Sequence, residues 1–127
     1  MPDIFSGDPA PHDITFNSTE FLARHTPEVV DPIVNSTIDY LRNTVGVKTL
    51  AVTGYCFGGR YAFRFGGESR GTNVVFTAHP SLLEDNEVSG VNAPASIAAA
   101  GGYPNPKLEQ SVNFLTMPFR DRSIDVT

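Results

Sequence analysis

The sequence predicts an α/β fold built on a short, mainly parallel β-sheet. Three short apolar runs alternate with segments that have helical spacing or end in glycine. This alternation is typical of parallel sheets, in which helices connect the strands and cover both faces of the sheet. A glycine-rich turn between the first run and the next helix is the third sign of this architecture.

The first part of the chain is expected to hold an irregular segment and a short helix. Three prolines and no periodicity through Pro11 predict an irregular surface segment there. Asn17 or Ser18 is then placed to cap a short helix over residues 20–24.

A longer helix is predicted around residues 33–41, because apolar residues recur there at helical spacing: Ile33, Val34, Ile38 and Leu41. Gly46 stands just past its end as a stop signal. Its start is open. Thr26–Pro27 and Asp31–Pro32 are both cap-plus-proline pairs, so residues 27–31 are either the first turn of this helix or a separate turn.

The predicted strands lie further along the chain. Residues 48–53 and 73–77 are short and apolar, which fits strands buried on both faces, and residues 95–100 are a weaker third strand. Residues 57–65 should form a helix that Gly66 and Gly67 end. From about residue 101 the tail diverges in character, with a turn expected at 103–106 and a candidate strand at 112–115.

Composition favours one ordinary globular domain over residues 1–127 that binds a small molecule. The formal net charge is −5 and there is no cluster of Lys and Arg, which argues against nucleic acid or an anionic membrane as partner. No apolar run is long enough for a membrane span, and the first residues do not resemble a signal peptide. We therefore expect a cytoplasmic protein with one free thiol, no metal and no cofactor.

The run from Gly54 to Gly59 predicts a turn that exposes the thiol of Cys56, the only cysteine. We expect the backbone at Cys56 to be strained, and glycines two residues away, Gly54 and Gly58, to prevent collisions with the adjoining strand and helix. The amide of Phe57 would face an oxyanion formed on an attacked carbonyl. The alternative is that Cys56 is simply a small buried hydrophobic residue.

A catalytic thiol also needs a base, and the three histidines are His12, His25 and His79. Only His79 lies downstream of Cys56, at the carboxyl end of the second strand, where ligands bind in parallel sheets. It is a candidate base or a structural histidine. We expect His12 and His25 to be solvated on the surface.

Acidic partners for a base are also sparse. We expect three carboxylates in the middle of the chain to form a solvated loop, and two in the tail to reach the site only if the tail folds back: Glu84, Asp85, Glu87, Asp121 and Asp125.

These motifs together resemble the fungal-type dienelactone hydrolase family of α/β hydrolases. The resemblance rests on Pro2-Asp3-Ile4-Phe5, on Gly54-Tyr55-Cys56-Phe57-Gly58-Gly59-Arg60, on Ala78-His79-Pro80-Ser81 and on Ser96-Ile97-Ala98-Ala99-Ala100. It implies a partial three-layer α/β-hydrolase-like fold, and hydrolysis of a lactone or small ester through an acyl-thioester on Cys56, with Phe57 as an oxyanion donor. The family's triad is Cys, Asp and His.

Against that family the chain is expected to be truncated at both ends. Its Pro-Asp-Ile-Phe segment, which lies well inside the family's domain, here follows Met1 directly. Gly101 and the residues after it stand where the family's aspartate belongs, and no histidine follows His79. An intact triad within this chain is therefore not expected.

Two further classes of function stay open. One is a non-catalytic protein that binds a small ligand or partner, with a pocket near Cys56 and His79 lined by Tyr55, Phe57, Arg60, Tyr61 or Phe76, although these aromatic residues also fit a core. The other is an isomerase or cyclase. We also expect the edge of the first strand, residues 49–53, to be covered by a second copy in a homodimer, by the chain's own tail or by a partner protein.

Overall fold

A computed structural model describes residues 1–11 and 16–98 of the chain. The chain divides into two compact units, Met1–Val47 and the part from Lys48 onward. The predictions for His12 and for the tail, including Asp121 and Asp125, lie outside the described residues.

The first unit contains two α-helices, α1 (Ser18–Arg24) and α2 (Pro27–Asp39). Asn17 caps α1 as predicted, because its side-chain oxygen accepts hydrogen bonds from the amides of Thr19 and Glu20. Helix α2 begins after Thr26 and runs through Pro32, so the interpretation of residues 27–31 as a separate turn was wrong.

A π-helical turn, η1 (Tyr40–Thr44), continues α2. Val45 closes it with a hydrogen bond of 3.0 Å from its amide to the carbonyl of Tyr40, five residues earlier. Gly46 follows with φ of +80°, so the predicted stop is confirmed at a position where the backbone needs glycine.

His25 is buried in this unit, so the expectation of a solvated surface histidine was wrong. Its side chain is 5% exposed, and its ring packs on Phe5 and Phe21 at centroid distances of 5.0 and 4.3 Å. Its Nδ1 lies 2.8 Å from the Phe21 carbonyl oxygen. The irregular N-terminal segment brings Phe5 onto the ring, a contact between distant residues that the sequence pattern did not indicate.

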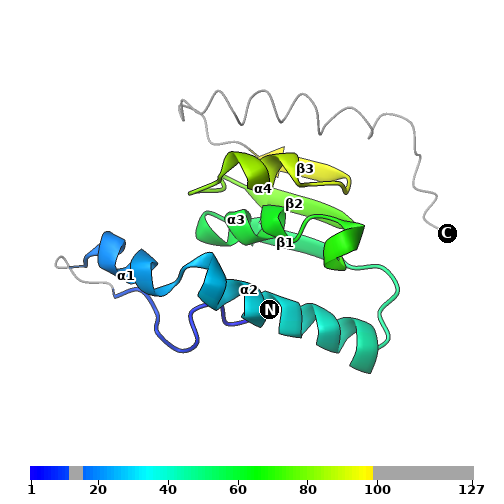
Figure 1. Cartoon of the computed structure of the whole chain (residues 1–127), viewed down its shortest axis with the longest axis horizontal. Coiled ribbons are helices and arrows are strands. Elements are labelled where there is room, and N and C mark those ends of the chain that lie inside the picture. The colour runs from blue at the N-terminus through cyan, green and yellow to red at the C-terminus, as the bar shows by residue number, and fades with distance from the viewer. Residues whose placement is uncertain (12–15, 99–127) are drawn as a thin grey trace. The chain divides into compact units, whose positions relative to one another are not determined.

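The second unit is a three-stranded parallel sheet in the order β1 (Ala51–Tyr55), β2 (Val74–Ala78) and β3 (Ala95–Ala98). The predicted α/β class with a parallel sheet is therefore confirmed (Figure 1). The first two strands begin and end one to three residues later than predicted. The connections carry α3 (Phe57–Arg64), η2 (Glu68–Arg70) and α4 (Asp85–Ser89).

One face of this sheet forms the core of the unit. The strand register aligns Val52, Val75 and Ala95 across the three strands, and α3 packs against β1 and β2, so Ala62 and Phe63 join the same cluster. Alternate residues face the other way, and Tyr55, Val74 and Phe76 are exposed. The prediction of strands buried on both faces was therefore wrong for the described residues. No helix among them is both long and apolar enough to span a membrane.

Candidate active site

Cys56 lies on the sharp turn between β1 and α3. Its φ and ψ are 49° and −118°, close to the values of about +60° and −120° at the first central position of a type II′ turn, which glycine normally occupies. A side chain held in this region is strained, and such strain gathers at functional sites. The thiol is exposed, so the alternative of a buried hydrophobic cysteine is wrong.

Two glycines allow this turn, and one of them differs from the predicted pair. A Cβ on Gly54 would lie 2.1 Å from the carbonyl oxygen of Gly58, so the strand and the helix touch there. A Cβ on Gly59 would lie 2.6 Å from the Thr77 hydroxyl oxygen and 2.9 Å from Pro80. A Cβ on Gly58 would meet nothing within 4 Å, so the predicted collision at Gly58 was wrong. Gly58 contributes its backbone to the close contact, and Gly59 provides the space for the next strand.

The segment that follows β2 is hydrogen-bonded to this turn. The Cys56 amide donates to the Ala78 carbonyl at 3.2 Å, and the Ser81 amide donates to the Cys56 carbonyl at 3.1 Å. The Ser81 hydroxyl lies 3.7 Å from the Cys56 sulfur, which is hydrogen-bond distance for sulfur. Ser81 thus places its hydroxyl within hydrogen-bond distance of the thiol.

Phe57 is the first residue of α3, directly after Cys56. The amides of a helix's first turn point toward the N-terminal end of the helix and carry partial positive charge. The position of this amide therefore suits the predicted oxyanion donor.

His79 also lies at the carboxyl edge of the sheet, but it makes no hydrogen bond with the sulfur in the described structure. Its amide donates to the Ala98 carbonyl at 2.8 Å, and its ring lies 6.4 Å from the ring of Tyr55. Its φ of +37° is a second strained value at this edge. The fold thus brings His79 near the turn at Cys56, but without a hydrogen bond to the thiol.

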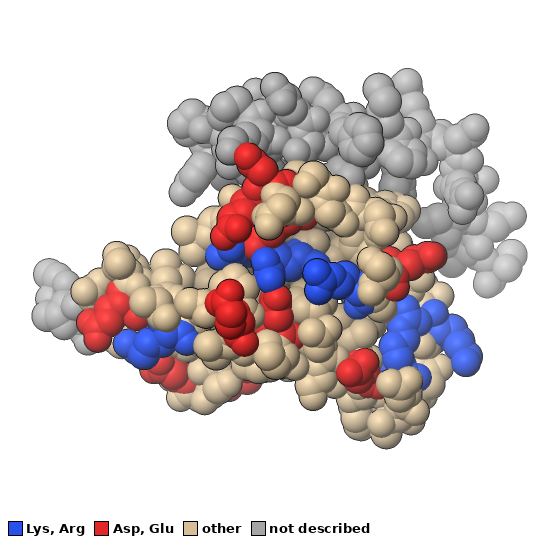
Figure 2. All heavy atoms as spheres, viewed as in Figure 1, with Lys and Arg blue, Asp and Glu red and all other residues tan. Residues whose placement is uncertain are grey.

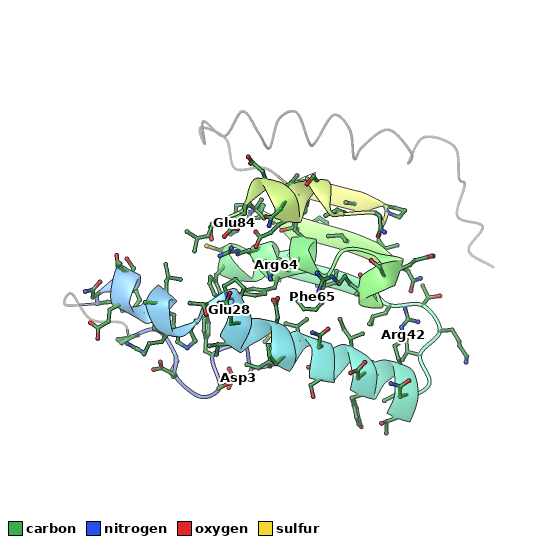
Figure 3. The ribbon with its side chains drawn as sticks, viewed as in Figure 1. Asp3, Glu28, Arg42, Arg64, Phe65 and Glu84 are labelled. Carbon is green, nitrogen blue, oxygen red and sulfur yellow. The ribbon has the colours of Figure 1, made fainter. Side chains whose placement is uncertain are left out.

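Helices α3 and α4 are joined by an ion cluster around the buried side chain of Glu87. The Glu87 side chain is 2% exposed and accepts from Arg60 at 2.8 Å and from Arg64 at 2.7 Å. Arg60 also contacts Glu84 at 2.5 Å. Acidic and basic side chains accordingly lie next to each other over these helices (Figure 2), and Arg64 and Glu84 are labelled at this junction in Figure 3.

The cluster overturns the expectation that Glu87 belongs to a solvated loop. Glu84 and Glu87 form a capping box at the start of α4, which places the Glu87 carboxylate inward. The predicted loop is therefore a short helix. Arg60, a candidate pocket residue, directs its guanidinium to Glu84 and Glu87.

The remaining candidate pocket residues divide between the core and the surface. Tyr61 is 3% exposed and packs against Phe57 at a ring distance of 5.2 Å. Tyr55 is 60% exposed and lies beside Phe76 on the open face of the sheet, at 6.3 Å. Within residues 1–11 and 16–98, no group of three or more His, Cys, Asp or Glu is arranged to hold a metal ion.

Sequence reasoning missed the contact of Ser81 with Cys56. The signal was present, since Ser81 follows the second strand as Cys56 follows the first, and the carboxyl ends of parallel strands share one edge. It also missed the ion cluster, although Arg60 and Arg64 stand four residues apart on one helix face.

Comparison with known proteins adds a second line of evidence. The model of the dienelactone hydrolase family matches residues 1–126. The chain is 35% identical over 120 residues to hydrolase pyvD of Aspergillus violaceofuscus, covering 91% of this chain and 49% of that protein. It is 36% identical over 110 residues to hydrolase tropI of Talaromyces stipitatus, covering 79% of this chain and 43% of that protein. The chain thus spans about half the length of these relatives. No solved structure matches it.

Proposed function

Because the chain belongs to the dienelactone hydrolase family, we propose that it hydrolyses a lactone or small ester with Cys56 as the nucleophile. The observation that supports this most directly is the strained backbone of Cys56 at the strand-to-helix turn, with its thiol exposed. Both relatives carry the name hydrolase, which agrees with the proposed class of reaction.

The proposed reaction has two steps. A base takes the thiol proton, and the Cys56 sulfur attacks the ester carbonyl, forming an oxyanion that accepts a hydrogen bond from the Phe57 amide. The carbon–oxygen bond to the alcohol breaks, the alcohol leaves with a proton, and an acyl-thioester remains on Cys56. Water then attacks the thioester, which releases the acid and restores the thiol.

His79 enters the proposal as a candidate base. Its place at the same edge of the sheet as Cys56 supports this role, which requires its ring to rotate toward the sulfur.

We propose that the protein acts in the cytosol, because a single thiol stays reduced there. Cell fractionation tests that location.

Hydrolysis of 4-nitrophenyl acetate and of dihydrocoumarin tests the proposal. We expect Cys56→Ala to lower both rates by on the order of 10²-fold or more, because the covalent route is lost. Ser96→Ala, an exposed change on β3, is the matched control and should leave the rates unchanged.

Equal hydrolysis by wild type and Cys56→Ala would remove Cys56 from the mechanism. If His79→Gln retains the wild-type rate while Cys56→Ala does not, another group is the base. Acyl-enzyme trapped at Cys56 and identified by mass spectrometry would separate covalent catalysis from simple binding of the ester.

A further inference from the structure

We propose that the Ser81 hydroxyl donates a hydrogen bond to the Cys56 thiolate and holds the sulfur in its attacking position. This inference rests on the proposed role of Cys56. It assigns a function to a residue that the proposed reaction steps do not use.

The contact itself has a defined direction once the thiol is ionised. The two atoms lie 3.7 Å apart, and in the neutral pair either atom could be the donor. A thiolate has no hydrogen to give, whereas the serine hydroxyl has one. The attacking form of Cys56 therefore requires Ser81 to be the donor, in a charge-assisted hydrogen bond that is stronger than the neutral one.

The backbone keeps the hydroxyl at this distance. The Ser81 amide donates to the carbonyl of Cys56 itself, at 3.1 Å, so the two residues are joined by main chain as well as by side chain. The preceding residue, Pro80, is buried, and its ring fills the space left by the missing side chain of Gly59. Because these contacts fix the serine before substrate arrives, little ordering remains to be done when the thiolate forms.

Ser81 keeps its own proton through the reaction. When the sulfur bonds to the carbonyl carbon, its negative charge passes to the carbonyl oxygen, and the serine hydrogen bond to sulfur weakens. When the thioester is hydrolysed the charge returns to sulfur, and the bond is restored. The serine therefore orients and stabilises the nucleophile and transfers no proton to the substrate.

Reaction of Cys56 with 4,4′-dithiodipyridine tests the inference without any substrate. Cys56 is the only cysteine, so the absorbance of the released thiopyridone reports on this thiol alone. Removing the Ser81 hydroxyl removes a hydrogen bond to the attacking sulfur. Because a hydrogen bond makes a modest net contribution, we expect the exchange rate at pH 7 to fall about threefold.

The variants are Ser81→Ala, Ser81→Thr, and Ser89→Ala as an exposed serine control on α4. We expect the threefold loss in Ser81→Ala, a rate close to wild type in Ser81→Thr, which keeps a hydroxyl, and no change in Ser89→Ala. A purely structural role for Ser81 predicts no rescue by threonine. If circular dichroism shows that Ser81→Ala is unfolded, Ser81→Val replaces it, because valine matches threonine in shape and lacks the hydroxyl.

The inference is overturned if Ser81→Ala exchanges at the wild-type rate. It is also overturned if Ser81→Val exchanges at the same rate as Ser81→Thr. The proposed function can fail separately. If no ester or lactone is hydrolysed but thiol exchange at Cys56 is still slower in Ser81→Ala, the inference about Ser81 stands and the hydrolase proposal falls. If Cys56 is required for hydrolysis but the exchange rate ignores residue 81, only the inference about Ser81 falls.

Discussion

Replacing Gly54 with alanine should force the first strand and the following helix apart. The added Cβ would lie 2.1 Å from the Gly58 carbonyl oxygen, 2.5 Å from the Gly58 carbonyl carbon and 2.8 Å from the Gly59 nitrogen. All three are backbone atoms, so no side chain can rotate away to relieve the overlap. Relief requires the start of α3 to move by about 1 Å, and Cys56 lies between the two touching residues.

The expected cost follows from two opposing effects. Overpacking of this kind costs about 1–3 kcal/mol, and rigid backbone neighbours favour the upper end of that range. Alanine recovers about 0.5–1 kcal/mol, because glycine loses more conformational freedom on folding. We therefore expect Gly54→Ala to lower the free energy of unfolding by about 2 kcal/mol.

Gly58→Ala is the matched control, since the same methyl group is added two residues after the cysteine. It meets nothing within 4 Å, and alanine inside a helix is favoured over glycine by about 1 kcal/mol. Gly54→Ala should thus be less stable than wild type and Gly58→Ala more stable. The free energies of unfolding of the two variants should differ by about 3 kcal/mol.

Urea denaturation followed by circular dichroism measures both variants, with equal m values as the condition for comparing midpoints. The rate of thiol exchange at Cys56, measured in the same samples, should change in Gly54→Ala only. The reasoning is refuted if the two midpoints coincide, or if Gly58→Ala is the less stable protein.

Two further predictions concern the ion cluster and the sheet edge. Glu87→Gln removes a buried negative charge between Arg60 and Arg64, which should destabilise the fold by about 3 kcal/mol. Thermal unfolding measures this loss of stability. A loss no larger than that of the exposed control Glu68→Gln would contradict a stabilising role of the cluster. Because β1 ends the sheet among the described residues, we propose that a second copy of the chain pairs with its outer edge. Light scattering should then give a dimer, and a monomer at high protein concentration would speak against this pairing.

The sequence predicted the fold class well because its signals are local. Asn17 and Gly46 mark helix ends through their own hydrogen bonds and backbone angles, and the glycines around Cys56 mark the turn for the same reason. Each of these features depends on residues within a few positions, so a reader of the sequence sees both partners at once.

The errors concern partners that are distant in the chain. Glu87 looks like a solvated carboxylate until α4 places it against arginines more than twenty residues earlier. His25 is buried by Phe5, which comes from an irregular segment with no periodicity to predict its direction. The contact of Ser81 with Cys56 likewise depends on the strand register, which neither run of residues specifies alone.

The two backbone hydrogen bonds of Cys56, one to Ala78 and one from Ser81, have a dynamic consequence. Its amide donates to the Ala78 carbonyl at the end of β2 and its carbonyl accepts from the Ser81 amide, so local unfolding of Ala78–Ser81 breaks two hydrogen bonds of Cys56. Opening of that segment therefore also loosens the backbone at Cys56. A ligand that displaced Ala78–Ser81 would also have to break the hydrogen bonds of this segment to Cys56. Ligands that bind at this edge of the sheet without moving the segment are therefore favoured.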